Sequence, residues 1–406
     1  MNYDHIIIGA GVLGGATAYH LKRQQPEARI LLLEKEARPG MGSTGKSAAL
    51  YRNIFSSETS RQLAASSISY YNQLGSKIRL NPTGYLWLFS REQWDSSVAA
   101  RAGLDPQRDQ LEFKDSTGAT ELIDINTGAE GKFSGVHAGI HGHNCGALSA
   151  MALANHYVEE FRKLGGLVQF NTMVNLFKFT GRGSRFAPWD NVRVQVVRDQ
   201  NGIGYEADNF IVTVGPWSHD LLRIPGVACG VLPKKRQLFG LWLRNPRDFA
   251  PKWTDGMKMP AIILPAGGIY IKPVLKRKML IVGCADDLGQ PYGMNDPEPD
   301  VHFFYQAIQP ALDHYFPGLN LRLKQKWSGF YAYHWPDKNP VVETVKNLTW
   351  CSGTSGSGIM KADALGRITA GKLLGEESVE LADGSKFRVS DLSLRERKVE
   401  TEKFII

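Results

Sequence analysis

The chain has 406 residues, of which 43% are hydrophobic and 22% are charged, as in ordinary globular proteins. This length favours two domains in one polypeptide over a single small core. The formal net charge is +8, but the lysines and arginines are scattered along the chain. The charge therefore disfavours nucleic acid as a partner and indicates mild attraction of anionic ligands.

The cysteines and the apolar segments indicate the cellular compartment in which the protein is expected. The four cysteines lie far apart without a C-x-x-C pair, so the sequence predicts neither a metal site nor a disulfide framework. No apolar run reaches the length of a membrane span, and the segment 6–18 lacks the features of a signal peptide. We expect a cytoplasmic protein, either free or peripheral to a membrane.

The first motif is a glycine-rich strand–turn–helix unit. A strand expected over residues 3–8 runs into Gly9, Gly11 and Gly14, which have the spacing G-x-G-x-x-G, and a helix is expected over Val12–Gln24. In such a unit the first glycine permits the turn, the second leaves room for a pyrophosphate, and the third lets the helix pack on the strand. Val12 and Leu13 stand at the helix amino terminus, which attracts phosphates.

A second strand, expected over residues 29–33, ends at Glu34 and Lys35. The carboxylate of Glu34 stands where it can accept hydrogen bonds from both ribose hydroxyls of a dinucleotide, and it disfavours a 2′-phosphate. The order of strand, helix, strand and glutamate predicts a nucleotide site. A glycine-rich turn without a ligand is the alternative.

The following loop favours FAD over NAD. The segment 40–52 is rich in small residues and leads into a probable helix. In a flavoprotein such a loop wraps the pyrophosphate and passes beneath the isoalloxazine, whereas a plain NAD dehydrogenase does not need it. A solvated loop is the alternative. The loop contributes the following candidate cofactor ligands: Ser43, Thr44, Gly45, Lys46 and Ser47.

The rest of the chain alternates between two layers. A strand near 84–89 precedes a polar, irregular stretch to Asn144, and a helix over 147–164 leads to a strand at 167–170. Further strands are expected at 210–214, 269–272, 279–282 and 348–352, the middle two in an antiparallel sheet above the flavin. Candidate flavin contacts from these segments are Val174, Gly215, Trp217, Gly353, Gly356, Ser357, Gly358 and Ile359.

We therefore expect an α/β fold with two interleaved domains. A Rossmann-like FAD-binding domain would comprise 1–84, 146–226 and 326–406. A substrate domain built on a mixed or antiparallel sheet would comprise 85–145 and 227–325.

Together these segments resemble the family of D-amino-acid oxidase, glycine oxidase, sarcosine oxidase and D-arginine dehydrogenase. The fingerprint with Glu34, the flavin loop, 215–217, 269–273, 329–331, 336–337 and 353–361 carry the resemblance. It implies the glutathione-reductase-like fold, non-covalent FAD and oxidation of an amino acid by hydride transfer to flavin N5, giving an imine that hydrolyses. The substrate would be a secondary or N-methylated amino acid such as sarcosine, or a D-amino acid.

The resemblance also suggests how the substrate is held. Arg52 and Lys361 fall where sarcosine oxidase-like members anchor the substrate carboxylate, and Tyr270 matches a substrate-contacting tyrosine of glycine oxidase-like members. Tyr331 stands where those members have an arginine. Tyr331, His334 and Arg236 are weaker candidates for the same cavity. Solvent-facing positions for Arg52 and Lys361, and simple packing of Tyr270, are the alternatives.

This sequence departs from the pattern of monomeric sarcosine oxidases at two positions near the flavin. Gly329 or Phe330 stands where monomeric sarcosine oxidases carry the cysteine that bonds the flavin, which disfavours a covalent link. No lysine in 279–283 matches the one that promotes reaction with oxygen. The acceptor is then oxygen, a quinone or a partner flavoprotein, and both a homo-oligomer and a heteromeric subunit fit. A non-catalytic FAD-binding assembly factor and a plain NAD dehydrogenase are the rival readings.

Overall fold

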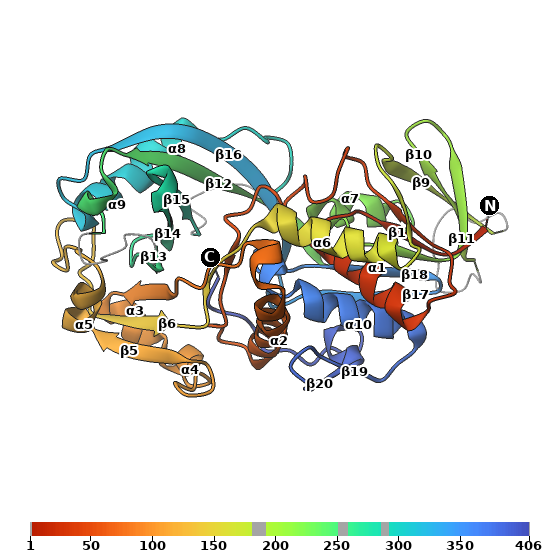
Figure 1. Cartoon of the computed structure of the whole chain (residues 1–406), viewed down its shortest axis with the longest axis horizontal. Helices are drawn as coiled ribbons and strands as arrows, with labels where there is room; N and C mark the ends of the chain where they lie inside the picture. The colour runs from red at the N-terminus through yellow and green to blue at the C-terminus, as the bar shows by residue number, and fades with distance from the viewer. Residues whose placement is uncertain (1, 181–191, 251–258, 286–291, 406) are drawn as a thin grey trace.

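The computed structural model describes residues 2–180, 192–250, 259–285 and 292–405, and they are arranged around two large sheets that lie side by side (Figure 1). The first sheet has the order β17-β18-β11-β1-β2-β8, with β10 beside β11 and β9 beside β10. Its strands are β1 (Asn2–Ile8), β2 (Ile30–Leu33), β8 (Leu167–Gln169), β9 (Val174–Phe179), β10 (Val194–Asp199), β11 (Gly204–Val212), β17 (Val341–Val345) and β18 (Leu348–Ser352).

The centre of this sheet is parallel and is buried on both faces. β1 pairs in parallel with β2 and with β11, and Ile6, Ile7 and Ile8 are almost completely buried. Such continuous apolar strands are typical of parallel sheets covered by helices. The fingerprint helix α1 begins and ends at Val12 and Gln24, as the sequence predicts.

Three helices pack together beside this sheet. Helix α1 lies between α6 (Ala150–Lys163) and α10 (Ala362–Leu374). The crossing with α10 is close, because a Cβ on Gly366 would lie 2.7 Å from the backbone of Ala16. Helix α10 begins later than expected, since Gly358–Met360 form a separate 3-10 turn. This packing holds the amino terminus of α1 against the end of β1.

The second sheet is mostly antiparallel and has the order β16-β12-β15-β14-β13-β4-β6-β5. One face packs on an aliphatic core that includes α5 and α9, and the other presents aromatic residues such as Tyr85 and Trp87 to the junction between the sheets. Its strands are β4 (Tyr85–Phe89), β5 (Leu111–Asp115), β6 (Ala138–Gly142), β12 (Val231–Leu243), β13 (Ala261–Ile263), β14 (Ile269–Val274), β15 (Met279–Cys284) and β16 (Leu321–His334).

Two details of the second sheet differ from the expectation. The stretch before Asn144 is regular rather than irregular, because β5 and β6 pair there and extend the sheet from β4. The expected boundary at 325/326 falls inside β16, which pairs with β12 from Leu321 to His334. The polar side chains of β5 and the two glycines of β6 hide the alternation that marks strands in a sequence.

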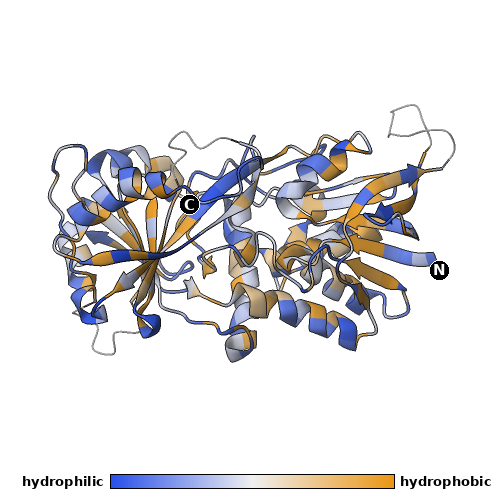
Figure 2. Ribbon diagram, turned by 90° about the horizontal axis from the view of Figure 1, so that it is seen from above, coloured by the Kyte–Doolittle hydropathy of each residue, from blue (hydrophilic) through white to orange (hydrophobic). Residues whose placement is uncertain are grey.

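The remaining elements connect the two sheets and cover their outer surfaces. Figure 2 shows hydrophobic strands inside and hydrophilic residues on the outer helices. Among the described residues, no helix is long and apolar enough to cross a membrane. The other elements are α2 (Glu58–Leu74), α3 (Arg91–Ser96), α4 (Val98–Arg101), α5 (Ser116–Leu122), α7 (Ser218–Arg223), α8 (Val301–Phe303), α9 (Gln309–Tyr315), β3 (Leu50–Tyr51), β7 (Gly146–Ala147), β19 (Ser378–Glu380) and β20 (Lys386–Arg388).

Candidate active site

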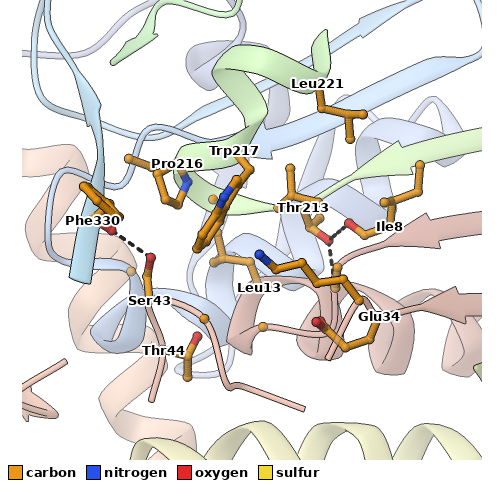
Figure 3. A pocket seen from close by; sticks show the side chains of 18 of the residues that line it. Ile8, Leu13, Glu34, Ser43, Thr44, Thr213, Pro216, Trp217, Leu221 and Phe330 are labelled. Atoms are coloured by element: carbon orange, nitrogen blue, oxygen red, sulfur yellow. Dashed lines mark hydrogen bonds between the residues drawn. The ribbon is translucent and has the colours of Figure 1, made fainter. Parts of the chain in front are cut away.

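A cavity of about 360 Å³ lies at the carboxyl ends of β1, β2 and β11 (Figure 3). Open α/β sheets bind ligands at this edge. Most of the candidate cofactor residues line this cavity. They are Gly9, Gly11, Val12, Leu13, Glu34, Lys35, Ser43, Thr44, Ser47, Val174, Gly215, Trp217, Gly356, Gly358 and Ile359.

Five candidate residues stand behind the wall of this cavity. A Cβ on Gly14 would lie 1.8 Å from the carbonyl oxygen of Gly9, so Gly14 permits the close packing expected of it. Gly45 makes a similarly close approach to Gly40. The Lys46 carbonyl accepts a hydrogen bond from the Trp327 indole (3.0 Å). The other two, Gly353 and Ser357, lie in the turn before α10.

The wall of the cavity offers groups that suit a dinucleotide. The hydroxyl of Thr44 accepts a hydrogen bond from the Val12 N–H (3.2 Å) at the start of α1. Beside it, Gly11 has no side chain to fill the space that a pyrophosphate needs. The carboxylate of Glu34 accepts hydrogen bonds from the N–H groups of Ala10 (2.6 Å) and Glu36 (3.0 Å). It keeps free lone pairs for ribose hydroxyls.

Burial and contacts fix these groups in place. Burial raises the pKa of Glu34 above its usual value, while the two backbone donors oppose that rise. The Lys35 ammonium lies 3.9 Å from the ring centroid of Trp217, at the mouth of the cavity. The Ser43 hydroxyl donates to the carbonyl of Phe330 (2.7 Å), which joins the flavin loop to β16.

The sequence analysis missed several residues of this wall. Thr213 donates its hydroxyl to the Ile8 carbonyl (2.9 Å), and Thr172 and Met173 follow β8. All three come directly after strands of the first sheet, so the rule that ligands bind at carboxyl strand ends could have identified them. Pro216, Asp220, Leu221 and Phe330 also line the cavity, but they carry no recognisable motif.

A second cavity of about 50 Å³ adjoins the first and shares Ser47, Tyr331, Gly356 and Ile359 with it. It lies between the flavin loop and the aromatic face of the second sheet. Its other lining residues are Ala48, Ala49, Leu50, Arg52, Phe55, Tyr85, Tyr270, Ser355, Ser357, Met360, Phe404 and Ile405.

Arg52 is the charged residue among those that line this second cavity. Its side chain is 3% exposed, and its guanidinium carbon lies 4.0 Å from the centroid of the Phe55 ring. One nitrogen, Nη2, donates to the carbonyl of Phe404. The other two, Nε and Nη1, are buried without a hydrogen-bond partner in the part of the chain that the structure describes. Because leaving such donors unpaired is costly, the site is suited to an incoming anion.

Lys361 lies behind the cavity rather than on its wall. It is completely buried, its ammonium donates to the Ser60 hydroxyl (2.8 Å), and it lies 4.4 Å from the centroid of the Phe55 ring. Burial lowers its pKa to about 7, while the Glu402 charge raises it and the Arg52 charge lowers it. The two cations predicted as one anchor are therefore neighbours, but Arg52 alone faces the cavity.

Tyr270 and Tyr331 both line the second cavity, and each occupies space that a glycine leaves free. A Cβ on Gly283 would lie 2.4 Å from the Tyr270 ring, and a Cβ on Gly356 would lie 2.4 Å from the Tyr331 ring. Burial raises the pKa of both phenols. Both phenols are thus protonated at neutral pH, and they hydrogen-bond each other.

Three further polar residues lie near the cavities. Lys272 pairs across the sheet with Ile281, within the segment where the sequence shows no lysine, and its ammonium donates to the Ala48 carbonyl (2.5 Å). Burial lowers the pKa of Lys272 to about 8. Arg236 lies 5.3 Å from the ring centroid of Tyr331. His334 bonds to Asp337 (3.0 Å) and does not line either cavity.

Comparison with known proteins agrees with this geometry. A model of a family described as "FAD dependent oxidoreductase" matches residues 4–372. FAD-dependent oxidoreductase domain-containing protein 1 of Xenopus laevis is 24% identical over 408 residues, covering 90% of this chain and 78% of that protein.

Two solved structures share the fold. L-proline dehydrogenase from P. horikoshii has a TM-score of 0.78 and 18% identity, covering 97% of this chain and 96% of that one. Glycine oxidase from Geobacillus kaustophilus has a TM-score of 0.75 and 18% identity, covering 97% and 98%. The fold is therefore the mixed α/β fold expected from the sequence, and the larger cavity is the candidate FAD site.

Proposed function

Because this chain belongs to the FAD-dependent oxidoreductase family, we propose that it oxidises the carbon–nitrogen bond of a small amino acid whose carboxylate binds Arg52. The observation that carries the proposal is the pair of unpaired donors on this buried guanidinium, which lines a cavity beside the flavin site. Each of these two nitrogens, which lie on different edges of the guanidinium plane, can donate a charge-assisted hydrogen bond to a carboxylate.

The residues of the second cavity would position the substrate. Arg52 would bind the carboxylate, and the phenols of Tyr270 and Tyr331 would donate hydrogen bonds and exclude water. When bound, the flavin would supply the hydride acceptor for oxidation of the carbon–nitrogen bond, and water would hydrolyse the imine product. This chemistry depends on close placement more than on a catalytic base, and no carboxylate lines the second cavity.

The preferred substrate is a secondary or N-methylated amino acid such as sarcosine, with a D-amino acid as the alternative. The name of one similar structure is that of a dehydrogenase of L-proline, a secondary amino acid, and the other is named an oxidase of glycine. Both names fit a small substrate. Anaerobic mixing with each candidate, followed by loss of the oxidised flavin absorbance, tests the choice and would also exclude a non-catalytic flavoprotein.

The substitution Arg52→Ala tests the carboxylate anchor. We expect KM for the amino acid to rise by about a hundredfold or more, with a smaller change in kcat, because charge-assisted hydrogen bonds contribute about 1.5–3 kcal/mol each. Arg91→Ala, at an exposed position on α3, is the matched control. An unchanged KM in the Arg52 variant would remove the anchor from the mechanism.

The residues of the two cavities constrain the electron acceptor less than they constrain the amino acid substrate. We propose oxygen, a quinone or a partner flavoprotein as acceptor, and the same reduced enzyme can be mixed with each to compare reoxidation rates. Lys272 places a cation beside the flavin loop, where a positive charge favours reduction of oxygen by stabilising the negative charge that develops.

A further inference from the structure

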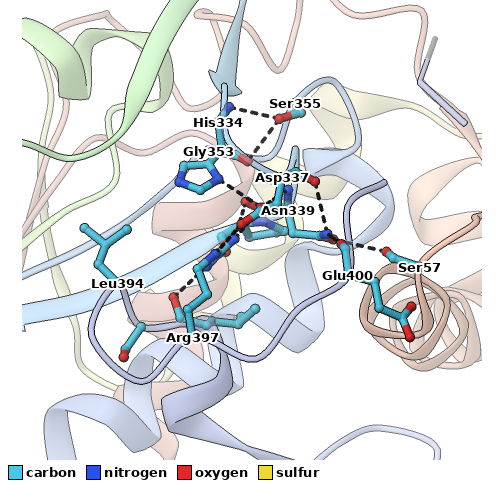
Figure 4. A network of polar contacts seen from close by, with 12 residues as sticks. Ser57, His334, Asp337, Asn339, Gly353, Ser355, Leu394, Arg397 and Glu400 are labelled. Carbon is cyan, nitrogen blue, oxygen red and sulfur yellow. Dashed lines mark hydrogen bonds and ion pairs between the residues drawn. The ribbon is translucent and has the colours of Figure 1, made fainter. Parts of the chain in front are cut away.

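The carboxyl-terminal segment 397–405 crosses the junction between the two halves of the molecule. Figure 4 shows how it is attached: Arg397 binds both oxygens of Asp337 (2.5 and 2.7 Å), and Asn339 donates to the Glu400 carbonyl (2.6 Å). Burial opposes ionisation of Asp337, but Arg397 and His334 hold its pKa well below the usual range. This ion pair therefore persists at neutral pH.

Glu402 anchors the segment more deeply. Its side chain is 1% exposed, and its carboxylate accepts hydrogen bonds from both the N–H and the hydroxyl of Ser56 (2.9 and 2.8 Å) and of Ser57 (3.0 and 2.9 Å). Although burial raises the pKa of Glu402, the charges of Lys361 and Arg52 lower it below the usual value. A buried charge with this many partners is a fixed structural feature.

These contacts place Phe404 in the substrate cavity. Its side chain is 5% exposed, and its ring centroid lies 5.1 Å from Trp87 and 6.3 Å from Phe89. Its carbonyl accepts the hydrogen bond from Arg52. The cavity that remains has about 50 Å³, whereas one water molecule occupies about 30 Å³ in the liquid.

From this arrangement we infer that Phe404 determines specificity by occupying the space that a larger substrate side chain would need. This inference rests on the proposed function, since it assigns a size limit to the same carboxylate site. Phe404 lies beside Arg52. We therefore expect a substrate whose carboxylate binds Arg52 to direct its own side chain toward the aromatic rings of Trp87 and Phe404.

The substitution Phe404→Ala tests this role. We expect kcat/KM for an amino acid with a large side chain, relative to sarcosine or glycine, to rise about tenfold or more, because apolar burial of that side chain becomes available. Tyr305→Ala, which removes an exposed aromatic residue of the same half, should leave the ratio unchanged. An unchanged ratio in a folded, flavin-loaded Phe404→Ala protein overturns the inference.

A binding measurement keeps this test separate from the proposed function. Acetate and cyclohexylacetate are titrated against the flavin absorbance of the wild-type holoprotein and of the variant. Tighter binding of cyclohexylacetate to the variant alone supports the size limit even if no amino acid is oxidised. If neither acid binds either protein, and Arg52→Ala leaves KM for the amino acid unchanged, both the carboxylate anchor and the size limit are wrong.

A different observation points to a metal site on the outer part of the second sheet. His141 lies on β6 opposite its cross-strand partner Glu112, and His143 follows directly after the end of β6. One ligand atom from each of the three lies within 4.8 Å of the others. His141 is 8% exposed and makes no side-chain hydrogen bond among the described residues, while its ring centroid lies 4.4 Å from that of His143.

The electrostatics of the three residues suit a cation. The imidazole of His141 is buried beside the other two residues, and a neutral imidazole is a common ligand of transition metals. One oxygen of Glu112 faces His143 (3.0 Å), and the other accepts from Lys114 (2.5 Å). Lys114 thus orients the carboxylate and leaves one oxygen for a metal.

We propose that Glu112, His141 and His143 bind a divalent transition-metal ion of the zinc type, with water completing the coordination. Two imidazoles and one carboxylate form a common zinc ligand set, and imidazole selects this class of metal over Mg²⁺ or Ca²⁺. The site is independent of the flavin chemistry.

Titration of the holoprotein with Co²⁺ and Zn²⁺ tests the metal site. We expect one Co²⁺ per chain with visible ligand-field bands, and at least tenfold weaker binding in Glu112→Gln and in His143→Ala. Both positions are about half exposed, so neither variant threatens folding. His137→Ala is the control. Binding that is absent, or that is equal in all variants, overturns the proposal.

Discussion

The two cavities differ in how their walls are assembled. The FAD site is built around one continuous motif, in which Gly9, Gly11 and Gly14 serve one turn and Glu34 follows on the neighbouring strand. The second cavity joins residues from six distant segments, and its cation, Arg52, contacts Phe404, which lies 352 positions away in the chain. A local motif is recognisable in a sequence, whereas a cavity assembled from distant segments is visible only after folding.

The largest effect on folding is expected at Gly14, where no larger residue fits. In Gly14→Ala the new Cβ would lie 1.8 Å from the Gly9 carbonyl oxygen, so we expect loss of the folded, yellow protein. In Gly11→Ala the Cβ meets only the Thr44 hydroxyl at 3.4 Å, so the chain should fold with a nearly unchanged Tm but bind FAD at least tenfold more weakly. Thermal unfolding and flavin content of the purified variants measure both. Equal behaviour of the two would contradict the division between a packing glycine and a phosphate-facing glycine.

A smaller effect, on the pH dependence of stability, is expected from the buried ammonium of Lys361. Because burial lowers the pKa of Lys361 to about 7, the unfolded chain binds more protons than the folded one between about pH 7 and the ordinary lysine value of about 10.4. The cost of burying the charge is then fully present below pH 7 and is relieved as pH rises through this window.

The substitution Lys361→Met removes that cost. The stability difference between the variant and the wild type should favour the variant most below pH 7. It should shift toward the wild type by about 1.4 kcal/mol per pH unit above it. Denaturant unfolding at several pH values measures this slope, with Lys163→Met, at a position 68% exposed, as control. A pH-independent difference would mean that Lys361 stays charged in the folded protein.

The smallest effect is expected at the mouth of the FAD site. Lys35→Ala removes the ammonium that lies 3.9 Å from the Trp217 ring centroid. Such contacts contribute about 0.5–1 kcal/mol at exposed sites, so FAD affinity should fall about threefold. Equilibrium titration of the apoprotein with FAD measures this change, and a loss of more than tenfold would assign Lys35 a direct contact with the cofactor.

The sequence predicts the motif-bearing elements well, because each is determined by local patterns. Helix α1 has the expected ends, and the strands near 30–33, 85–89 and 348–352 lie within two residues of their predicted positions. The orientation of Lys361 could not be predicted, since its partner Ser60 is 301 positions away. The contacts of Phe404 likewise depend on a segment that carries no recognisable motif.

The antiparallel pair of β12 and β16 has a mechanical consequence. These strands stay paired from Leu321 to His334, and the same β16 supplies Phe330 to the FAD site and Tyr331 to both cavities. In Figure 1 this long ribbon runs from the outer edge of one half to the centre of the molecule. A hinge within the length of this pair would have to break its ladder of hydrogen bonds. We therefore expect the ladder to hold Phe330 and Tyr331 at a fixed position relative to the second sheet.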